Sequence, residues 1–284
     1  MHDENSPQVH EVGVGRFTFE VTVAGPPEGR PILLLHGFPQ TSWSWRHVIP
    51  PLAAAGHRVL AMDQRGYSPK ASPDAVEQYR GEHLVSDVLG VLDASGIDSV
   101  DVVGHDWGAA VAWQVASWHP TRVRTLTALS VPHPGAFTEA LRVDADQRRR
   151  SAYMRDFATP GFEHTLLADG AAKLRALFGH DAGVDVEHVL SRVGTTPVLR
   201  RALNWYSAQS LDRPATTPAT DVPTLHVWSD QDIALGEYGA RATERYVTGP
   251  YELVTLHGVS HWIPEHAPAQ TAELILRHVA DRER

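Results

Sequence analysis

Short apolar runs alternate with helical stretches along much of the chain, and this alternation constrains the fold more than any other feature. Residues 32–35 form a continuous apolar run, as expected of a strand that is buried on both faces, and a similar short run recurs at 100–103. Strands that alternate with helices form βαβ units, which build a mostly parallel sheet with helices on its faces. The other predicted strands are 17–23, 58–62, 126–131, 224–228 and 251–256, and the predicted helices are 42–55, 81–95, 107–119 and 268–280.

The alternation stops between residues 134 and 218. Helical patterns follow one another there without a strand pattern, over residues 142–157, 163–178, 186–192 and 197–210. A Pro- and Thr-rich stretch, residues 213–218, then returns the chain to the sheet. We therefore predict one α/β core with an insertion: residues 1–133 and 219–284 form the core, and residues 134–218 form a helical lid.

Composition excludes several classes of partner. The chain has 284 residues, a formal net charge of −9 and no cysteine. The negative charge argues against nucleic acid and anionic membranes as partners, and the lack of cysteine excludes disulfides and metal thiolates. No apolar run approaches the roughly 20 residues that a membrane span needs. We expect a soluble, cytoplasmic protein with no metal and no cofactor, and the sequence leaves open whether it forms a homo-oligomer.

The segment from Gly104 to Gly108 reads Gly-His-Asp-Trp-Gly and joins a predicted strand to a predicted helix. A nucleophile between small residues in that place is typical of a nucleophile elbow, a sharp turn that exposes the central side chain. The central residue is Asp106, whose carboxylate is ionised at neutral pH and can attack carbon to form an alkyl ester. Asp106 therefore predicts a strained or activated alkyl substrate, chiefly an epoxide or an alkyl halide.

Further candidate residues follow other predicted strands, at the edge where open parallel sheets bind ligands. His261 lies just beyond the last strand, where it can activate water for attack on the ester. Asp232 or Asp230, in the loop after strand 224–228, would orient the His261 imidazole. The backbone N–H groups of Phe38 and Trp107 are the predicted oxyanion hole.

These residues together resemble the α/β-hydrolase superfamily and, within it, the epoxide hydrolases. The resemblance covers nearly the whole chain: His-Gly-Phe-Pro at 36–39, Asp-Gln-Arg-Gly-Tyr-Ser at 63–68, the elbow, a lid, and the acid and histidine loops. It implies an α/β-hydrolase fold, in which nucleophile, acid and histidine follow in that order. The family places its acid three positions after the residue equivalent to Ser229, which favours Asp232 over Asp230.

The resemblance also implies two lid tyrosines that protonate the epoxide oxygen as the C–O bond breaks. Tyr206 ends an Asn-Trp-Tyr sequence, and Tyr153 lies upstream of the Phe-x-x-Pro-Gly sequence at 157–161. A neutral phenol can donate to a developing alkoxide. The expected reaction converts an epoxide to a vicinal diol through an ester on Asp106. The side chains expected to line the substrate pocket are His36, Pro39, Trp205 and Trp262.

Two alternative functions remain open. A haloalkane or haloacid dehalogenase would use the same Asp106 nucleophile. Such enzymes usually have Asn where Phe38 stands, a second tryptophan for the halide, or arginines soon after the nucleophile, and residues 107–111 contain no arginine. A noncatalytic ligand-binding protein of the same fold is the second alternative, although such a protein does not need the complete triad.

Overall fold

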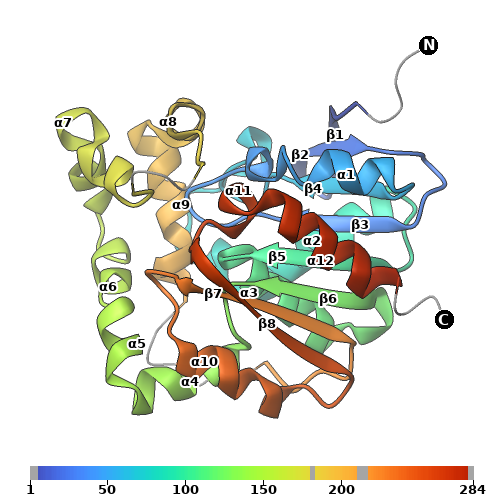
Figure 1. Cartoon of the computed structure of the whole chain (residues 1–284). Helices are drawn as coiled ribbons and strands as arrows, with labels where there is room; N and C mark the ends of the chain where they lie inside the picture. The colour runs from blue at the N-terminus through green and yellow to red at the C-terminus, as the bar shows by residue number, and fades with distance from the viewer. Residues whose placement is uncertain (1–5, 180–182, 210–216, 281–284) are drawn as a thin grey trace.

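The computed structural model describes residues 6–179, 183–209 and 217–280. Its centre is an eight-stranded sheet with the strand order β1-β2-β4-β3-β5-β6-β7-β8 (Figure 1). The pairs β1–β2 and β2–β4 are antiparallel, and the other neighbouring strands are parallel, which confirms the predicted mostly parallel sheet. The strands are β1 (Gln8–Val14), β2 (Phe17–Ala24), β3 (Pro31–Leu35), β4 (Arg58–Met62), β5 (Val100–His105), β6 (Val123–Leu129), β7 (Thr224–Gln231) and β8 (Tyr251–Ser260).

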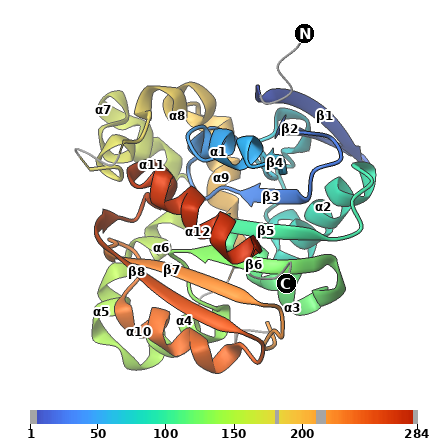
Figure 2. The same ribbon diagram turned by 45° about the vertical axis from the view of Figure 1, so that its right-hand side comes forward.

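Helices cover both faces of the sheet and create two hydrophobic cores. Successive side chains of a strand point to opposite faces, so Leu33 and Leu35 of β3 join one core while Ile32 and Leu34 join the other. Helices α2 and α3 pack on the first face, and α1 and α12 pack on the second (Figures 1 and 2). These helices are α1 (Ile49–Ala54), α2 (Gly81–Ala94), α3 (Trp107–Trp118) and α12 (Pro268–Ala280).

Two elements near the N-terminus differ from the prediction. The edge strand β1 was not predicted, because its side chains are mostly exposed and form no apolar run. The predicted helix 42–55 is a 3-10 turn, η1 (Ser42–Trp45), followed by the short helix α1. Two prolines stand in the first turn of α1, and proline is tolerated there because the first N–H groups of a helix have no intrahelical partner. The break before α1 follows from these prolines.

Between β6 and β7 the chain forms a series of helices at the carboxyl end of the parallel strands (Figure 1). The predicted helix 142–157 is in fact divided among three helices, because the Asp144 side chain accepts the N–H groups of Asp146 and Gln147 and starts a new helix. Parts of the predicted segment, at 180–182 and 210–216, lie outside the described residues. The helices are α4 (Pro134–Val143), α5 (Ala145–Arg150), α6 (Tyr153–Phe157), α7 (Phe162–Ala176), α8 (Val186–Val193) and α9 (Thr196–Ala208).

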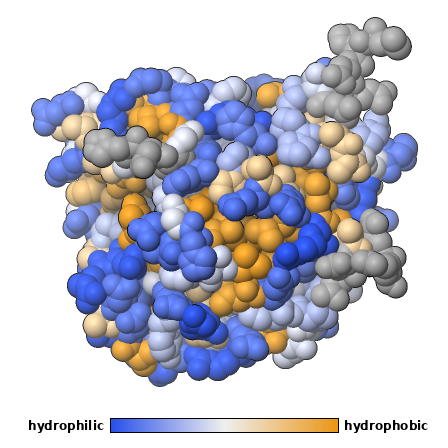
Figure 3. All heavy atoms as spheres, in the orientation of Figure 1, coloured by the Kyte–Doolittle hydropathy of each residue, from blue (hydrophilic) through white to orange (hydrophobic). Residues whose placement is uncertain are grey.

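The remaining elements are short and connect the core. Figure 3 shows the face that α12 covers, where apolar residues gather in the middle and hydrophilic residues surround them. No helix in the described part of the chain is long and apolar enough to cross a membrane.

The short elements are α10 (Glu237–Ala242), α11 (Ile263–His266), η2 (Pro69–Ala71), η3 (Val76–Tyr79), η4 (Pro120–Arg122) and η5 (Thr243–Tyr246).

Candidate active site

Asp106 lies in a sharp turn between β5 and α3. Its backbone has φ 53° and ψ −124°, a conformation that a residue with a side chain rarely adopts and that indicates local strain. The glycines around it are required by close contacts. A Cβ atom on Gly104 would lie 2.3 Å from the carbonyl oxygen of Gly108, and one on Gly37 would lie 2.3 Å from the Cβ atom of Asp106. The turn therefore has the geometry of the predicted nucleophile elbow.

The Asp106 carboxylate is buried and fixed from two sides. Oδ1 accepts the backbone N–H of Phe38 at 2.8 Å, and Oδ2 lies 3.6 Å from Nε2 of His261. Burial alone raises the pKa of Asp106, but the interaction with His261 and the backbone N–H of Trp107 outweigh it and hold the pKa below its ordinary value. Asp106 is therefore ionised at neutral pH, as a nucleophile requires.

His261 lies between two carboxylates. Its Nδ1 is 3.0 Å from Oδ2 and 3.1 Å from Oδ1 of Asp232, while its Nε2 faces Asp106. Asp230, the rival for the acid position, instead contacts the exposed His257 at 2.9 Å. Burial lowers the pKa of His261, but the charges and hydrogen bonds of the two carboxylates outweigh burial and raise it. The two carboxylates therefore favour the protonated form of the imidazole.

Ser130 is a part of the site that the sequence did not reveal. Its hydroxyl donates to Oδ2 of Asp232 at 2.5 Å and lies 3.1 Å from Nδ1 of His261. The backbone N–H groups of Ala234 and Leu235 donate to the other oxygen, Oδ1, at 2.8 and 2.9 Å. Three donors besides His261 thus fix the Asp232 carboxylate. The available sequence signal was a polar residue at the end of a strand, but the predicted strand ran to residue 131 and included Ser130.

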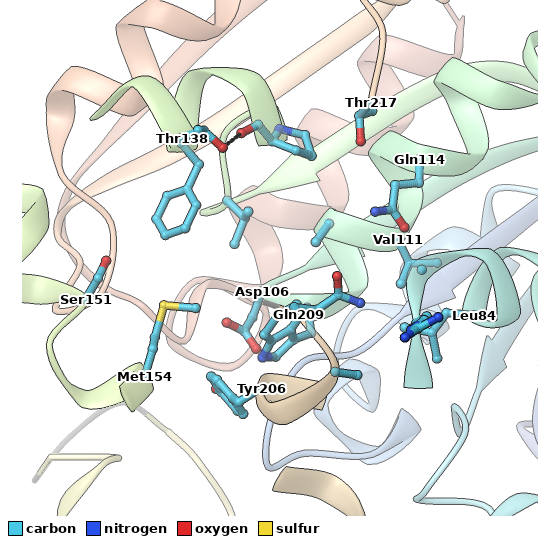
Figure 4. Close-up of a pocket in the computed structure, with 18 of the residues that line it drawn as sticks. Leu84, Asp106, Val111, Gln114, Thr138, Ser151, Met154, Tyr206, Gln209 and Thr217 are labelled. Carbon is cyan, nitrogen blue, oxygen red and sulfur yellow. Dashed lines mark hydrogen bonds between the residues drawn. The ribbon is translucent and has the colours of Figure 1, made fainter. Parts of the chain in front are cut away.

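Tyr153 and Tyr206 lie close to Asp106 in the same cavity. Tyr153 begins α6 and Tyr206 belongs to α9, and their ring centroids are 6.2 Å apart. Figure 4 shows Tyr206 beside Asp106. Burial is the largest cause that raises the pKa of each phenol, and the negative charge of Asp106 adds to it. Both phenols therefore stay neutral at physiological pH and retain a proton to donate.

The cavity in front of Asp106 has a volume of about 370 Å³, within the range of small-molecule sites. Trp107, Tyr153 and Tyr206 form its wall near Asp106, and residues of α3 and α4 continue the wall away from it. The described residues contain no cluster of three or more His, Asp or Glu side chains that could hold a metal ion.

The structure also locates the expected pocket residues, which are His36, Pro39, Trp205 and Trp262. All four are buried, but none is among the described residues that line the cavity. Nε2 of His36 accepts the N–H of Gln64 at 3.1 Å, and the indole of Trp205 donates to the carbonyl of Arg65 at 2.9 Å. These polar side-chain atoms of His36 and Trp205 thus have hydrogen-bond partners within the protein, behind the cavity wall.

Comparisons with known proteins agree with this architecture. A family model described as alpha/beta hydrolase fold matches residues 30–268. Epoxide hydrolase A of Mycobacterium tuberculosis is 30% identical, over 98% of this chain and 99% of that protein. The AB hydrolase superfamily protein YfhM of Bacillus subtilis is 32% identical, over 95% of this chain and 97% of that protein. A solved structure described under novel epoxide hydrolases in metagenomes from hot environments has a TM-score of 0.88 and 26% identity, over 96% of this chain and 99% of that chain. The chain therefore belongs to the α/β-hydrolase superfamily and, within it, to the epoxide hydrolase family.

Proposed function

We propose that this protein hydrolyses an epoxide to a vicinal diol through an alkyl ester on Asp106. One observation carries the proposal: an ionised carboxylate at a nucleophile elbow shares a cavity with two neutral phenols. Epoxide opening needs a nucleophile for carbon and a proton for oxygen, and these groups supply both. The relatives named epoxide hydrolases support the same reaction.

In the first step, Asp106 attacks one carbon of the epoxide while the ring C–O bond breaks. The N–H of Phe38 holds Oδ1, so Oδ2 is the attacking oxygen. The electron pair of the broken bond stays on the epoxide oxygen, which takes a proton from Tyr153 or Tyr206. A phenol suits this step because it keeps its proton at rest and gives it to a stronger base, the developing alkoxide.

In the second step, water attacks the ester carbonyl with His261 as the base. Ester formation removes the charge of Asp106, one of the two charges that raise the pKa of His261. The protonated imidazole then gives its proton back to the tyrosinate that ring opening left behind, and the neutral imidazole can accept a proton from water. The N–H groups of Phe38 and Trp107 stabilise the oxyanion. Collapse of this intermediate breaks the ester C–O bond, and the departing alkoxide takes a proton from His261 to give the diol. The carboxylic acid of Asp106 then returns its proton to the imidazole, which restores the resting site.

We also propose that residues 134–218 act as a lid on a core formed by residues 1–133 and 219–284. Both tyrosines come from this segment, on α6 and α9, whereas Asp106, Asp232 and His261 follow strands of the sheet. The two proton donors and the nucleophile therefore belong to different layers of the molecule. Substrate specificity and proton donation would change with the lid while the triad stays in place.

A single turnover in oxygen-18 water tests the ester mechanism directly. With enzyme in excess over a simple terminal epoxide, the oxygen added to the first diol comes from Asp106, so the diol remains unlabelled. Mass spectrometry of the diol, and of the peptide that contains Asp106, measures both positions. We expect label in Asp106 after one turnover and in the diol only later. Label in the first diol would contradict the ester and indicate direct attack of water on the epoxide.

The two chemical steps should depend differently on pH. Ring opening needs ionised Asp106, whose pKa is lowered, and neutral tyrosines, whose pKa values are raised. Its rate should therefore be flat from about pH 5 to 9. Ester hydrolysis needs neutral His261, whose pKa in the ester form lacks the contribution of Asp106. Hydrolysis should therefore slow as the pH falls through the pKa that His261 has in the ester form. The ester on Asp106 should then accumulate at low pH.

Rapid quenching followed by intact mass spectrometry at each pH measures both rates. Faster hydrolysis at pH 5 than at pH 8 would contradict the role given to His261.

A further inference from the structure

The cavity extends well beyond Asp106 along one face of α3. The α3 residues that line it recur every three or four positions, with one adjacent pair at 110 and 111, so they lie on one side of the helix; they are Trp107, Ala110, Val111, Gln114 and Trp118. At 1.5 Å per residue, the distance from Trp107 to Gln114 is about 10 Å. A compact epoxide next to Asp106 would leave this arm of the cavity empty, so the arm suits a substrate with a long substituent.

The part of the arm nearer Asp106 is apolar. Ala110 and Val111 of α3 and Leu84 of α2 form one wall, and α4 contributes Phe137 and Leu141. Figure 4 shows Leu84 and Val111 together on one side of Asp106, with Ser151 and Met154 on the other. This composition favours a hydrocarbon chain, since burial of apolar surface contributes about 0.8 kcal/mol per CH₂ group.

The far end of the arm is polar. The side-chain amide of Gln114 lines it and has no hydrogen-bond partner among the residues that the structure describes. Gly81 leaves room for this amide, because a Cβ atom there would lie 2.5 Å from Oε1 of Gln114. Arg80 and Glu82 also line this end, and their opposite charges offset each other. A primary amide offers both donors and an acceptor, so it matches an uncharged group that can do the same.

We infer that the substrate is an elongated epoxide whose apolar substituent, about 10 Å long, ends in a hydroxyl or amide group that binds Gln114. This inference rests on the proposed epoxide hydrolysis. At roughly 1.2 Å per bond of an extended chain, the substituent spans about eight bonds. Gln114 is a specificity-determining residue in this arrangement and takes no part in the reaction at Asp106.

The test compares kcat/KM for terminal epoxides that share a chain of about eight bonds and end in methyl, hydroxymethyl or carboxylate. A short epoxide without the chain establishes that the enzyme is active. We expect the hydroxyl-ended substrate to exceed the methyl-ended one by about three- to tenfold, the range of a single net hydrogen bond. In Gln114→Leu this ratio should fall to about one. Both kcat/KM values of the ratio are measured on the same protein variant. A general loss of activity lowers both values equally and leaves their ratio unchanged.

Gln270→Leu is the matched control. It makes the same chemical change on the exposed surface of α12, outside the cavity lining, and should keep the wild-type ratio. If Gln114→Leu does not fold, Gly81→Ala tests the same contact by displacing Oε1 of Gln114. Ala110→Phe adds a second readout: a ring in the apolar part should lower kcat/KM for the long substrates relative to the short one.

The outcomes separate the two proposals. A ratio near one in the wild type, an unchanged ratio in Gln114→Leu, or a preference for the carboxylate would overturn the inference and leave the proposed function standing. If the enzyme converted only the short epoxide to its diol and none of the long ones, the inference would also be overturned and the proposed function would stand. No diol from any epoxide, together with no ester on Asp106, would overturn the proposed function and this inference with it.

Discussion

Asp106→Asn is expected to lower kcat by about 10⁴-fold or more, as loss of the attacking group does in other covalent enzymes. Asparagine keeps the shape of aspartate and tolerates positive φ better than most residues, so the turn at φ 53° should persist. The amide cannot form the ester. Diol production from an epoxide, measured by chromatography, reports the loss, and thermal unfolding reports the fold. Intact mass spectrometry confirms that the amide has not reverted to the acid.

Asp230→Asn is the matched control for this substitution. Asp230 is also an aspartate at the carboxyl end of the sheet, near the end of β7, but it contacts His257 and Gly258 outside the cavity lining. Its replacement should leave kcat within about twofold, in line with the small effects of most surface substitutions. Folded Asp106→Asn protein with substantial activity would refute Asp106 as the nucleophile.

His261→Gln is expected to stop the reaction after ring opening. Without its base, the enzyme should hydrolyse the ester about 10²- to 10⁴-fold more slowly, so the ester on Asp106 should accumulate. Intact mass spectrometry after incubation with an epoxide should show a gain equal to the whole mass of the epoxide. Digestion should then locate the adduct on the peptide that contains Asp106.

The adduct mass also decides between the proposed reaction and dehalogenation. An alkyl halide that reacts at Asp106 adds its own mass less that of HX, so parallel incubations with halides give a distinct signal. His257→Gln is the control, because His257 is an exposed histidine four residues away that contacts Asp230. The His257→Gln variant should convert the epoxide to the diol without accumulating the ester on Asp106. Adducts from halides but not from epoxides would move the assignment to a dehalogenase.

The sequence predicted the sheet well because buried parallel strands leave continuous apolar runs. It also indicated Asp106 and His261, since each follows a strand at the edge where such sheets bind ligands. The structure then brings Asp232, and not Asp230, to His261. The residues 229–232 do not by themselves reveal which of the two carboxylates turns inward, so the residues alone left this choice open.

Nearness in sequence does not determine the direction of a side chain, so sequence motifs alone do not tell which residues line the cavity. Trp205 precedes Tyr206 on α9, yet successive residues on a helix point about 100° apart. Tyr206 therefore faces the cavity while Trp205 packs toward Arg65. The cavity arm along α3 was missed for a related reason. Gln114 belongs to no motif, and only the packing of α2 and α4 around α3 makes its face part of a cavity.

The parallel pairing of β6 with β7 has a consequence for how enzymes of this kind can diversify. Leu126 is paired with Thr224, and Leu129 with Val227, so the strands before and after the helical segment are direct neighbours in the sheet. In topological terms the whole segment is a long loop between adjacent strands. This segment can be lengthened, shortened or replaced by that of a relative without any change in the strand order of the sheet that carries Asp106 and His261. New selectivity can thus evolve by exchange of this one segment while Asp106, Asp232 and His261 stay in place, provided that the new segment again supplies phenols where Tyr153 and Tyr206 stand.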